Sequence, residues 1–114
     1  MVTPYRIREE GLLTLRVERE GEALVIRARG EVDIASAAAL EGELESAIGS
    51  GDVTQVVLDL GGLTFVDSTG LRALLAAGEL ARTKHRRIQI VHAPAVFRRL
   101  VGISGVERSL PPID

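Results

Sequence analysis

The sequence predicts an α/β fold, because stretches with a strand-like pattern alternate along the chain with stretches that have a helical pattern. Apolar and polar residues alternate over 13–18 and again over 23–30. Apolar residues at helical spacing follow over 34–48, and a short apolar strand pattern returns at 53–60. The chain has 114 residues and no repeat, linker or low-complexity tract, so we expect one domain spanning residues 1–114.

The two strand patterns near the start of the chain predict an antiparallel hairpin. In the first, Leu13, Leu15 and Val17 alternate with polar residues, as in a strand that buries one face. Glu20-Gly21-Glu22 then supplies a turn, and the alternation resumes over 23–30. Consecutive strands joined by so short a turn pair most simply with each other.

A helix is expected to follow the hairpin. Its apolar stripe consists of residues three or four positions apart, namely Ile34, Ala37, Leu40, Leu44, Ala47 and Ile48. Asp33 or Ser36 can cap the start of this helix by accepting backbone N–H groups, and Gly49-Ser50-Gly51 ends it. Because another strand is expected at 53–60, the strand, the helix and the strand together predict a right-handed crossover.

The second half of the chain is expected to continue this alternation. Gly61-Gly62 predicts a loop, a helix follows over 68–83, and residues 87–92 form another short strand. The helix at 68–83 carries two apolar stripes, which favours wide burial under neighbouring helices over a docking face for a partner. Pro94 suits the first turn of a third helix, in which Gly102 can take the left-handed position at the end. At most one brief element is expected after that helix.

Composition excludes several classes of function. The chain has no Cys, which removes disulfides, thiolate metal sites and Cys nucleophiles. It has one Tyr, two Phe, no Trp and a net charge of −2, so nucleic acid is not an expected partner. The longest apolar stretches are about six residues and Met1–Glu10 is charged, so we expect no membrane insertion and no export signal. The expected location is the cytoplasm.

The segment Phe65-Val66-Asp67-Ser68-Thr69-Gly70-Leu71 places an acid and two hydroxyl residues where a helix is expected to begin. Unpaired N–H groups and a partial positive charge at a helix N-terminus favour an anion, so a phosphate on Ser68 would be well placed. The alternative is structural: Ser68 is the N-cap of the helix, and Asp67 is a loop acid that the helix dipole stabilises. The spacing alone favours this structural interpretation and leaves the other open.

Catalytic and metal-site patterns fit the sequence poorly. A hydrolase nucleophile elbow requires Gly two positions before the Ser, where Val66 stands. His85 and His92 lack an acid at ligand spacing, so no metal is expected. Asp59 and Asp67 are not accompanied by a buried base or nucleophile. We therefore expect no catalytic residues, no cofactor and no enzymatic activity.

Two basic clusters, Lys84-His85-Arg86-Arg87 and Arg98-Arg99, lie near the C-terminal halves of expected helices. Cations at such positions complement the helix dipole. We interpret both clusters as solvated faces, with contact to an acidic partner as the alternative.

Four parts of the chain together carry a resemblance to a known family. They are Gly30-Glu31-Val32-Asp33, Val56-Val57-Leu58-Asp59-Leu60, the segment from Phe65 to Leu71, and the late Ala93-Pro94, Phe97, Leu100 and Ile103-Ser104-Gly105-Val106. In these residues the chain resembles a stand-alone STAS domain (sulfate transporter and anti-sigma factor antagonist), and most of all a bacterial anti-sigma factor antagonist. The resemblance implies an α/β STAS fold, with a four-to-five-stranded mixed sheet and about three to four helices packed mainly on one face.

The same resemblance implies roles for individual residues. In that family the first hydroxyl residue after the Asp is phosphorylated by a cognate anti-sigma factor, a serine protein kinase of the histidine-kinase-like ATPase type. The matching residue here is Ser68. The implied partner-binding residues are Asp33, Asp67, Ser68, Thr69, Gly70 and Leu71.

The function implied by the resemblance is partner switching. The unphosphorylated protein would bind the anti-sigma factor and free the sigma factor, and phosphorylation at Ser68 would abolish that binding. A phosphatase could reset the switch. The alternative is a STAS accessory or scaffold subunit of a stress-signalling or membrane transport complex, which docks without a phosphorylation cycle.

Overall fold

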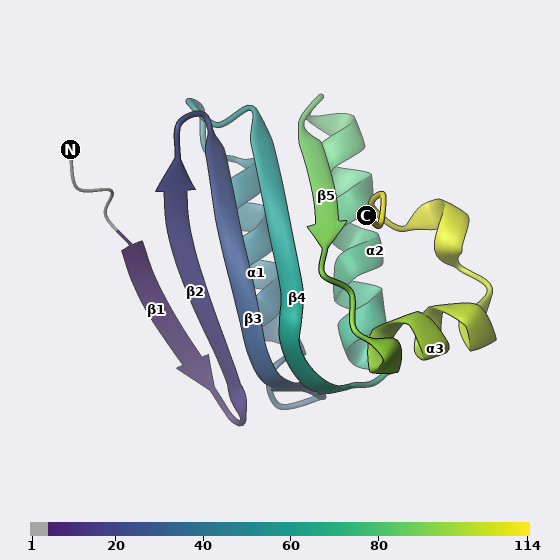
Figure 1. Ribbon diagram of the computed structural model, residues 1–114. Helices are drawn as coiled ribbons and strands as arrows, with labels where there is room; N and C mark the ends of the chain where they lie inside the picture. The colour runs from purple at the N-terminus through teal and green to yellow at the C-terminus, as the bar shows by residue number, and fades with distance from the viewer. Residues whose placement is uncertain (1–4) are drawn as a thin grey trace.

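Five strands form one mixed sheet in the computed structural model, which describes residues 5–114 (Figure 1). The strands are β1 (Tyr5–Glu10), β2 (Leu13–Glu20), β3 (Ala23–Val32), β4 (Gln55–Val66) and β5 (Arg87–Val91). Their order across the sheet is their order in the chain. β1, β2 and β3 pair antiparallel, while β3, β4 and β5 pair parallel. The predicted α/β class and the antiparallel hairpin are thus confirmed. No export signal is expected in Met1–Glu10, and the first four residues of that segment lie outside the described residues.

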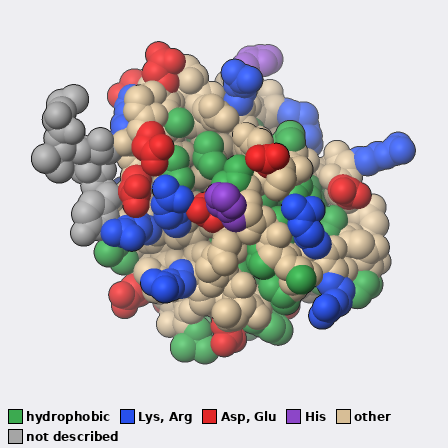
Figure 2. Space-filling model, in the orientation of Figure 1, with side chains coloured by type: hydrophobic (Ala, Val, Ile, Leu, Met, Phe, Trp, Pro, Cys, Tyr) green, Lys and Arg blue, Asp and Glu red, His purple; other side chains and the backbone are tan. Residues whose placement is uncertain are grey.

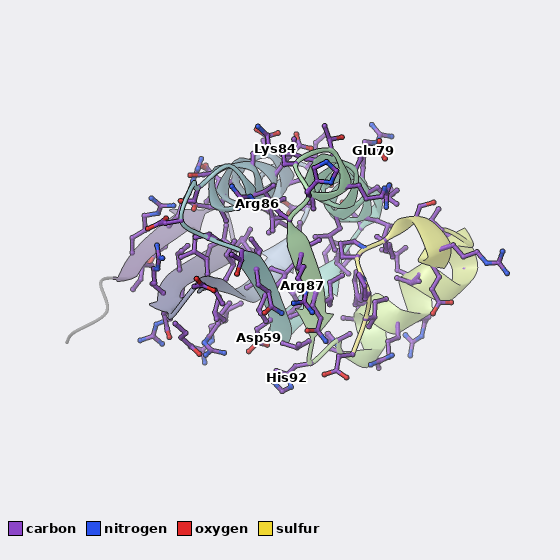
Figure 3. The ribbon with its side chains drawn as sticks, turned by 90° about the horizontal axis from the view of Figure 1, so that it is seen from above. Asp59, Glu79, Lys84, Arg86, Arg87 and His92 are labelled. Carbon is purple, nitrogen blue, oxygen red and sulfur yellow. The ribbon has the colours of Figure 1, made fainter. Side chains whose placement is uncertain are left out.

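Three helices accompany the sheet. They are α1 (Ala37–Ile48), α2 (Ser68–Thr83) and α3 (Ala95–Ser104), and a single 3-10 turn, η1 (Glu107–Ser109), follows them. α1 joins β3 to β4, and α2 joins β4 to β5. Seen from above, α1 and α2 lie side by side on one face of the sheet, while α3 and η1 lie beyond the β5 edge (Figure 3). The expected packing of helices mainly on one face is therefore confirmed.

The hydrophobic core lies between the sheet and the two helices that cover it. Its largest fully buried side chains come from the strands, from α1 and α2, and from α3; they include Leu15, Ile26, Leu58, Leu40, Leu74 and Phe97. The second apolar stripe of α2 is buried too, because Ala73 and Ala77 are only 2% and 1% exposed. The interpretation of that stripe as wide burial is confirmed, since α1 and α2 pack against each other.

The predicted loop at Gly61-Gly62 is wrong, because β4 continues through both glycines. The pairing of β3 with β4 shifts register here, so that Arg27 lies opposite Asp59 and Arg29 lies opposite Gly62. At this irregularity the two backbones come close together: a Cβ atom on Gly62 would lie 3.1 Å from the carbonyl oxygen of Ala28. Glycine therefore serves a close backbone approach within a strand rather than a turn.

Two predicted helix boundaries also differ. Ile34 was expected on the buried stripe of the first helix, but α1 begins only at Ala37 and the Ile34 side chain is 83% exposed. At the end of α3 the left-handed residue is Gly105, with φ of 69°, rather than Gly102, which lies inside the helix. The helical spacing thus extends beyond the residues that form α1, whereas α3 continues past the glycine that was expected to end it.

The first strand of the sheet does not appear in the strand patterns recognised above. It is attached to α1 through Glu43, whose side chain is only 7% exposed although the neighbouring acids are on the solvent side. Arg6 of β1 donates to the Glu43 carboxylate at 2.6 Å, and Arg8 lies 3.9 Å from it. A buried carboxylate of this kind requires cationic partners, and β1 supplies them.

No helix within residues 5–114 covers the other face of the sheet. Basic and acidic side chains intermix there (Figure 2), and Asp59 and His92 lie on this face, away from α1 and α2 (Figure 3). Arg27 of β3 donates to the Asp59 carboxylate of β4 at 2.7 Å. Polar residues at alternate strand positions therefore explain why this face can remain in contact with solvent.

Candidate functional site

The candidate site lies at the carboxyl ends of β3 and β4. Val32 and Val66 are the last residues of these parallel strands and lie opposite each other in the ladder. Asp33 and Asp67 come directly after them, each just before a helix. The sheet register therefore brings together two of the predicted site residues that are far apart in the sequence.

Asp67 is the N-cap residue of α2. Its Oδ1 atom accepts hydrogen bonds from the backbone N–H groups of Thr69 and Gly70, at 2.9 and 3.4 Å, and from the Thr69 hydroxyl. The Thr69 hydroxyl, with help from the two N–H groups, holds the pKa of the Asp67 carboxyl below its ordinary value of 3.8, although partial burial opposes this shift. Asp67 is therefore a fixed negative charge at the start of the helix.

Ser68 is the first residue of α2, and its side chain is exposed. The structural alternative, in which Ser68 caps the helix and Asp67 is a loop acid, is wrong because Asp67 makes the capping bonds. The Ser68 hydroxyl has no hydrogen-bond partner among the described residues. Its position leaves it open to a reaction with another molecule, at the positive end of the helix dipole.

Asp33 is held in a tight turn between β3 and α1. Its Oδ1 atom accepts hydrogen bonds from the backbone N–H of Ala35 at 3.0 Å and from the Ser36 hydroxyl at 3.3 Å. The Asp33 carbonyl also accepts from the N–H groups of Ser36 and Ala37. Ser36 is fully buried and is the N-cap residue of α1, but its side chain makes no capping bond, and the Asp33 carboxylate bonds only within the turn. The predicted side-chain cap of this helix by Asp33 or Ser36 is therefore wrong.

Gly70 and Leu71 form the underside of the site. Gly70 is buried against Val32 and Val66, and the Leu71 side chain is 4% exposed. Their side-chain positions face the core, so both residues support the surface that Ser68 occupies rather than forming it. Thr69 is partly exposed, and its hydroxyl donates a hydrogen bond to the Asp67 carboxylate.

Three exposed apolar side chains at the same end of the sheet were missed by the sequence analysis as site residues. Leu12, in the turn before β2, is 67% exposed, Ile34 is 83% exposed, and Phe65, near the end of β4, is 43% exposed. The Leu12 carbonyl accepts from the N–H of Glu31, and Glu31 lies opposite Phe65, which brings these segments together. Exposed apolar residues of this size often mark a contact surface for another protein. We call Leu12, Ile34 and Phe65 the apolar rim.

Within residues 5–114, no three His, Asp or Glu side chains lie close enough together to hold a metal ion. Among the helices of that same range, none is both long and apolar enough to cross a membrane. His85 and His92 stand apart from the site, each at the end of an element and each with a positive φ, of 55° and 56°.

Comparison with known proteins identifies the family. A family model described as "Mlab, STAS domain" matches residues 15–112. The chain is 26% identical over 102 residues to an anti-sigma F factor antagonist of Paenibacillus polymyxa, covering 90% of this chain and 87% of the relative. It is 33% identical over 86 residues to an anti-sigma F factor antagonist of Lysinibacillus sphaericus, covering 75% and 73% of the two chains.

Solved structures resemble the fold closely. An anti-sigma factor antagonist from Mycobacterium paratuberculosis aligns with a TM-score of 0.76 and 26% identity, over 89% of this chain and 85% of that one. The Bacillus cell fate determinant SpoIIAA in its phosphorylated form aligns with a TM-score of 0.65 and 20% identity, over 97% and 91% of the two chains. The matched family model covers both strands that end in the site and the helix that begins there. The resemblance seen in the sequence is thereby confirmed, and the chain belongs to the STAS domain family.

Proposed function

We propose that this protein is an anti-sigma factor antagonist that switches partners through phosphorylation of Ser68. The observation that carries the proposal is the exposed Ser68 hydroxyl, which has no hydrogen-bond partner in residues 5–114 and stands at the first position of α2. The relatives named anti-sigma F factor antagonist support the role. The structure of a phosphorylated SpoIIAA supports the proposal that such a fold can carry a phosphate.

The chemical step is a phosphoryl transfer catalysed by the partner. The partner is an anti-sigma factor that is also a serine kinase of the histidine-kinase-like ATPase type, and it supplies ATP and Mg²⁺. The Ser68 oxygen forms a bond to the γ-phosphorus, the bond from that phosphorus to the β-phosphate oxygen breaks, and ADP leaves. The hydroxyl proton passes to a base on the kinase. This protein contributes the nucleophile, the Ser68 hydroxyl, and no catalytic group.

The folded state is expected to tolerate the phosphate. The modification adds about −1.5 to −2 charges at the N-terminus of α2, where the helix dipole favours an anion. Asp67, which is already ionised, lies next to it, but its Oδ1 atom is engaged by Thr69 and Gly70. The unfavourable interaction between the two anions is therefore offset locally by the helix terminus.

Binding to the anti-sigma factor is expected to be lost for a different reason. The partner surface would cover Ser68, Asp33 and the apolar rim, which together combine a polar centre with apolar contacts. In the complex, the phosphate and Asp67 would both be removed from water against a surface that fits a neutral hydroxyl. A hundredfold loss of affinity corresponds to about 2.7 kcal/mol, which one unpaired charge can cause. A phosphatase that removes the phosphate would restore binding.

The test is the intact mass of the protein after incubation with purified anti-sigma kinases and ATP. We expect a gain of one phosphate in the wild type and none in Ser68→Ala, with the modified peptide containing Ser68. Thr69→Val is the matched control, because it removes the neighbouring hydroxyl and should still be phosphorylated. A kinase that binds the protein tightly yet never modifies it would contradict the switch and favour the non-switching scaffold instead.

A further inference from the structure

β5 is the last strand in the sheet, and only part of its outer edge is paired. The C-terminal segment covers the later half: the N–H of Ile90 donates to the Pro112 carbonyl at 2.8 Å, and the Ile90 carbonyl accepts from the N–H of Asp114 at 2.8 Å. This places Ile113 beside Ile90 in a short parallel bridge. Figure 1 shows the C-terminus reaching β5 at this point.

The earlier half of the same edge is open. In a parallel ladder, alternate residues direct their N–H and C=O groups to the same neighbour. The N–H of Arg87 donates to the Thr54 carbonyl on the β4 side, and Ile90 bonds outward, so Ile88 also faces outward. The outward N–H and C=O of Ile88 have no backbone partner within the part of the chain that the structure describes. An edge of this kind is a template for another extended chain.

A hollow of about 400 Å³ lies beside this open stretch. It is lined by the last turns of α2, the start of β5 and the segment 110–112. Its apolar wall consists of Ala81, Ile88, Leu110, Pro111 and Pro112, and its polar lining includes Arg82, Arg86 and Arg87. The hollow therefore combines a strand edge, an apolar wall and three guanidinium groups.

The three arginines leave positive charge unbalanced. Arg82 pairs with Glu79 at 2.6 Å, but both side chains are mostly exposed, so this pair is weak. Arg86 donates from one terminal nitrogen to the Val53 carbonyl, while its Nε atom is buried and has no hydrogen-bond partner among residues 5–114. Arg87 is exposed, and no ion pair to it exists in that range. Figure 3, which looks down α2, shows Arg86 beside the helices and Arg87 at β5.

We infer that the open edge of β5 binds an extended, acidic peptide segment of another protein by strand addition. The backbone of that segment would pair with Ile88, and its carboxylates would bind Arg82, Arg86 and Arg87. The unpaired strand edge favours a polypeptide over a free anion, and the charge favours an acidic one. This site is separate from the Ser68 site, because the length of α2 between Ser68 and Arg82 is roughly 20 Å.

The first test uses a short fluorescein-labelled peptide of alternating Glu and Val, followed by fluorescence anisotropy. We expect saturable binding that weakens as salt is added, and at least a tenfold weaker affinity for Arg87→Glu. Arg99→Glu, on α3, is the matched control, because it makes the same charge change at an exposed position away from the hollow. Equal loss of affinity in the two variants, or equal affinity for a peptide with Gln in place of Glu, would overturn the inference.

The second test examines strand pairing itself. On addition of the peptide, hydrogen exchange of the Ile88 amide, followed by NMR, should slow by at least tenfold, while peptides methylated at their backbone nitrogens should bind more weakly. Unchanged exchange at Ile88 would contradict strand addition. If sedimentation instead shows a dimer that Arg87→Glu dissociates, the edge serves a second copy of this chain, and the proposal of an acidic partner is wrong. None of these outcomes depends on Ser68, so they leave the partner-switching proposal untouched.

Discussion

Gly70 of α2 lies so close to Val32 of β3 that a Cβ atom at position 70 would be 2.8 Å from Val32 Cγ1. The same atom would be 2.8 Å from Cγ2 of Val66, the last residue of β4. The first turn of α2 therefore rests directly on the paired ends of two strands. This contact determines where Ser68 stands relative to Asp33.

Replacing Gly70 with Ala should destabilise the protein by about 1 to 3 kcal/mol, because the added methyl group overpacks a contact between a helix and two strands. The free energy of unfolding, measured by urea denaturation, checks this. Gly102→Ala is the control: no atom lies within 4 Å of its added Cβ, and α3 is helical there. That change should stabilise by up to about 1 kcal/mol. A Gly70→Ala variant as stable as the wild type would contradict the close packing.

The Asp67 charge should make stability depend on pH in the acid range. Its pKa is lowered on folding from the ordinary value of 3.8, so the ionised form is the one that the folded state favours. The contribution is complete above the unfolded pKa and is lost as the pH falls through the lower, folded pKa. The difference in unfolding free energy between the wild type and Asp67→Asn should therefore shrink between neutral pH and about pH 2. A difference that stays constant over this range would show that the capping bonds do not depend on the charge.

Ser68→Asp should fail to bind the anti-sigma factor while remaining folded. A negative charge in the first turn of α2 interacts favourably with the helix dipole, by about 0.3 to 1 kcal/mol, so the melting temperature should not fall. Calorimetric affinity for the anti-sigma factor should decrease by about a hundredfold or more, equivalent to about 2.7 kcal/mol. Ser68→Ala should retain wild-type affinity. If Ser68→Asp bound as tightly as Ser68→Ala, charge at this position would not control binding.

The apolar rim should contribute to binding without contributing to stability. Ile34→Ser removes a side chain that is 83% exposed, and Ile103→Ser removes one that is 79% exposed on α3. Both variants should unfold within about 0.5 kcal/mol of the wild type. Only Ile34→Ser should weaken binding to the anti-sigma factor, by about fivefold to tenfold. Similar affinities for the two variants would place the partner surface elsewhere.

The ion pair between Arg6 and Glu43 should contribute more to the free energy of unfolding than an exposed ion pair of the same length. The two atoms are 2.6 Å apart, as are those of Arg82 and Glu79, but the Glu43 side chain is 7% exposed and that of Glu79 is 72% exposed. Arg6→Met would leave a buried carboxylate with only Arg8 nearby, so we expect a loss of about 1 to 3 kcal/mol. Arg82→Met should change stability by less than about 1 kcal/mol. Equal effects in thermal or urea unfolding would show that β1 is not held by this pair.

Local sequence patterns correctly predicted the strands and helices that depend only on residues close together in the chain. The alternation over 13–18 and 23–30 gave a hairpin because each strand buries one face, and the predicted helix at 68–83 has the same ends as α2. The segment from Phe65 to Leu71 was recognised as the candidate site because acid, hydroxyl and glycine stand together in a few residues. Its internal geometry is equally local, since Asp67 bonds to residues two and three positions later.

Other features of the fold and of the site could not be predicted, because they depend on contacts between residues far apart in the chain. Gly61-Gly62 has the sequence pattern of a loop, and only the approach of the β3 backbone explains why β4 has a glycine at position 62. Glu43 resembles its solvated neighbours until Arg6 is brought to it from β1. Ile34 fits a helical stripe by spacing, but the turn around Asp33 places it outside the helix. Spacing cannot report a contact between distant segments.

The order of the strands in the sheet has a consequence for how the molecule forms. Each strand after β1 pairs with the strand that precedes it in the chain, so no strand has to wait for a later one to be made before it can pair. The antiparallel pairs close over short turns, whereas the parallel partners, such as Ala23 and Gln55, lie far apart in the chain, so the parallel pairings lose more entropy in closing loops and form more slowly. During synthesis the sheet can therefore grow from β1 toward β5 as each strand emerges. The edge completed last, at β5, is the same one that stays partly open in the finished molecule.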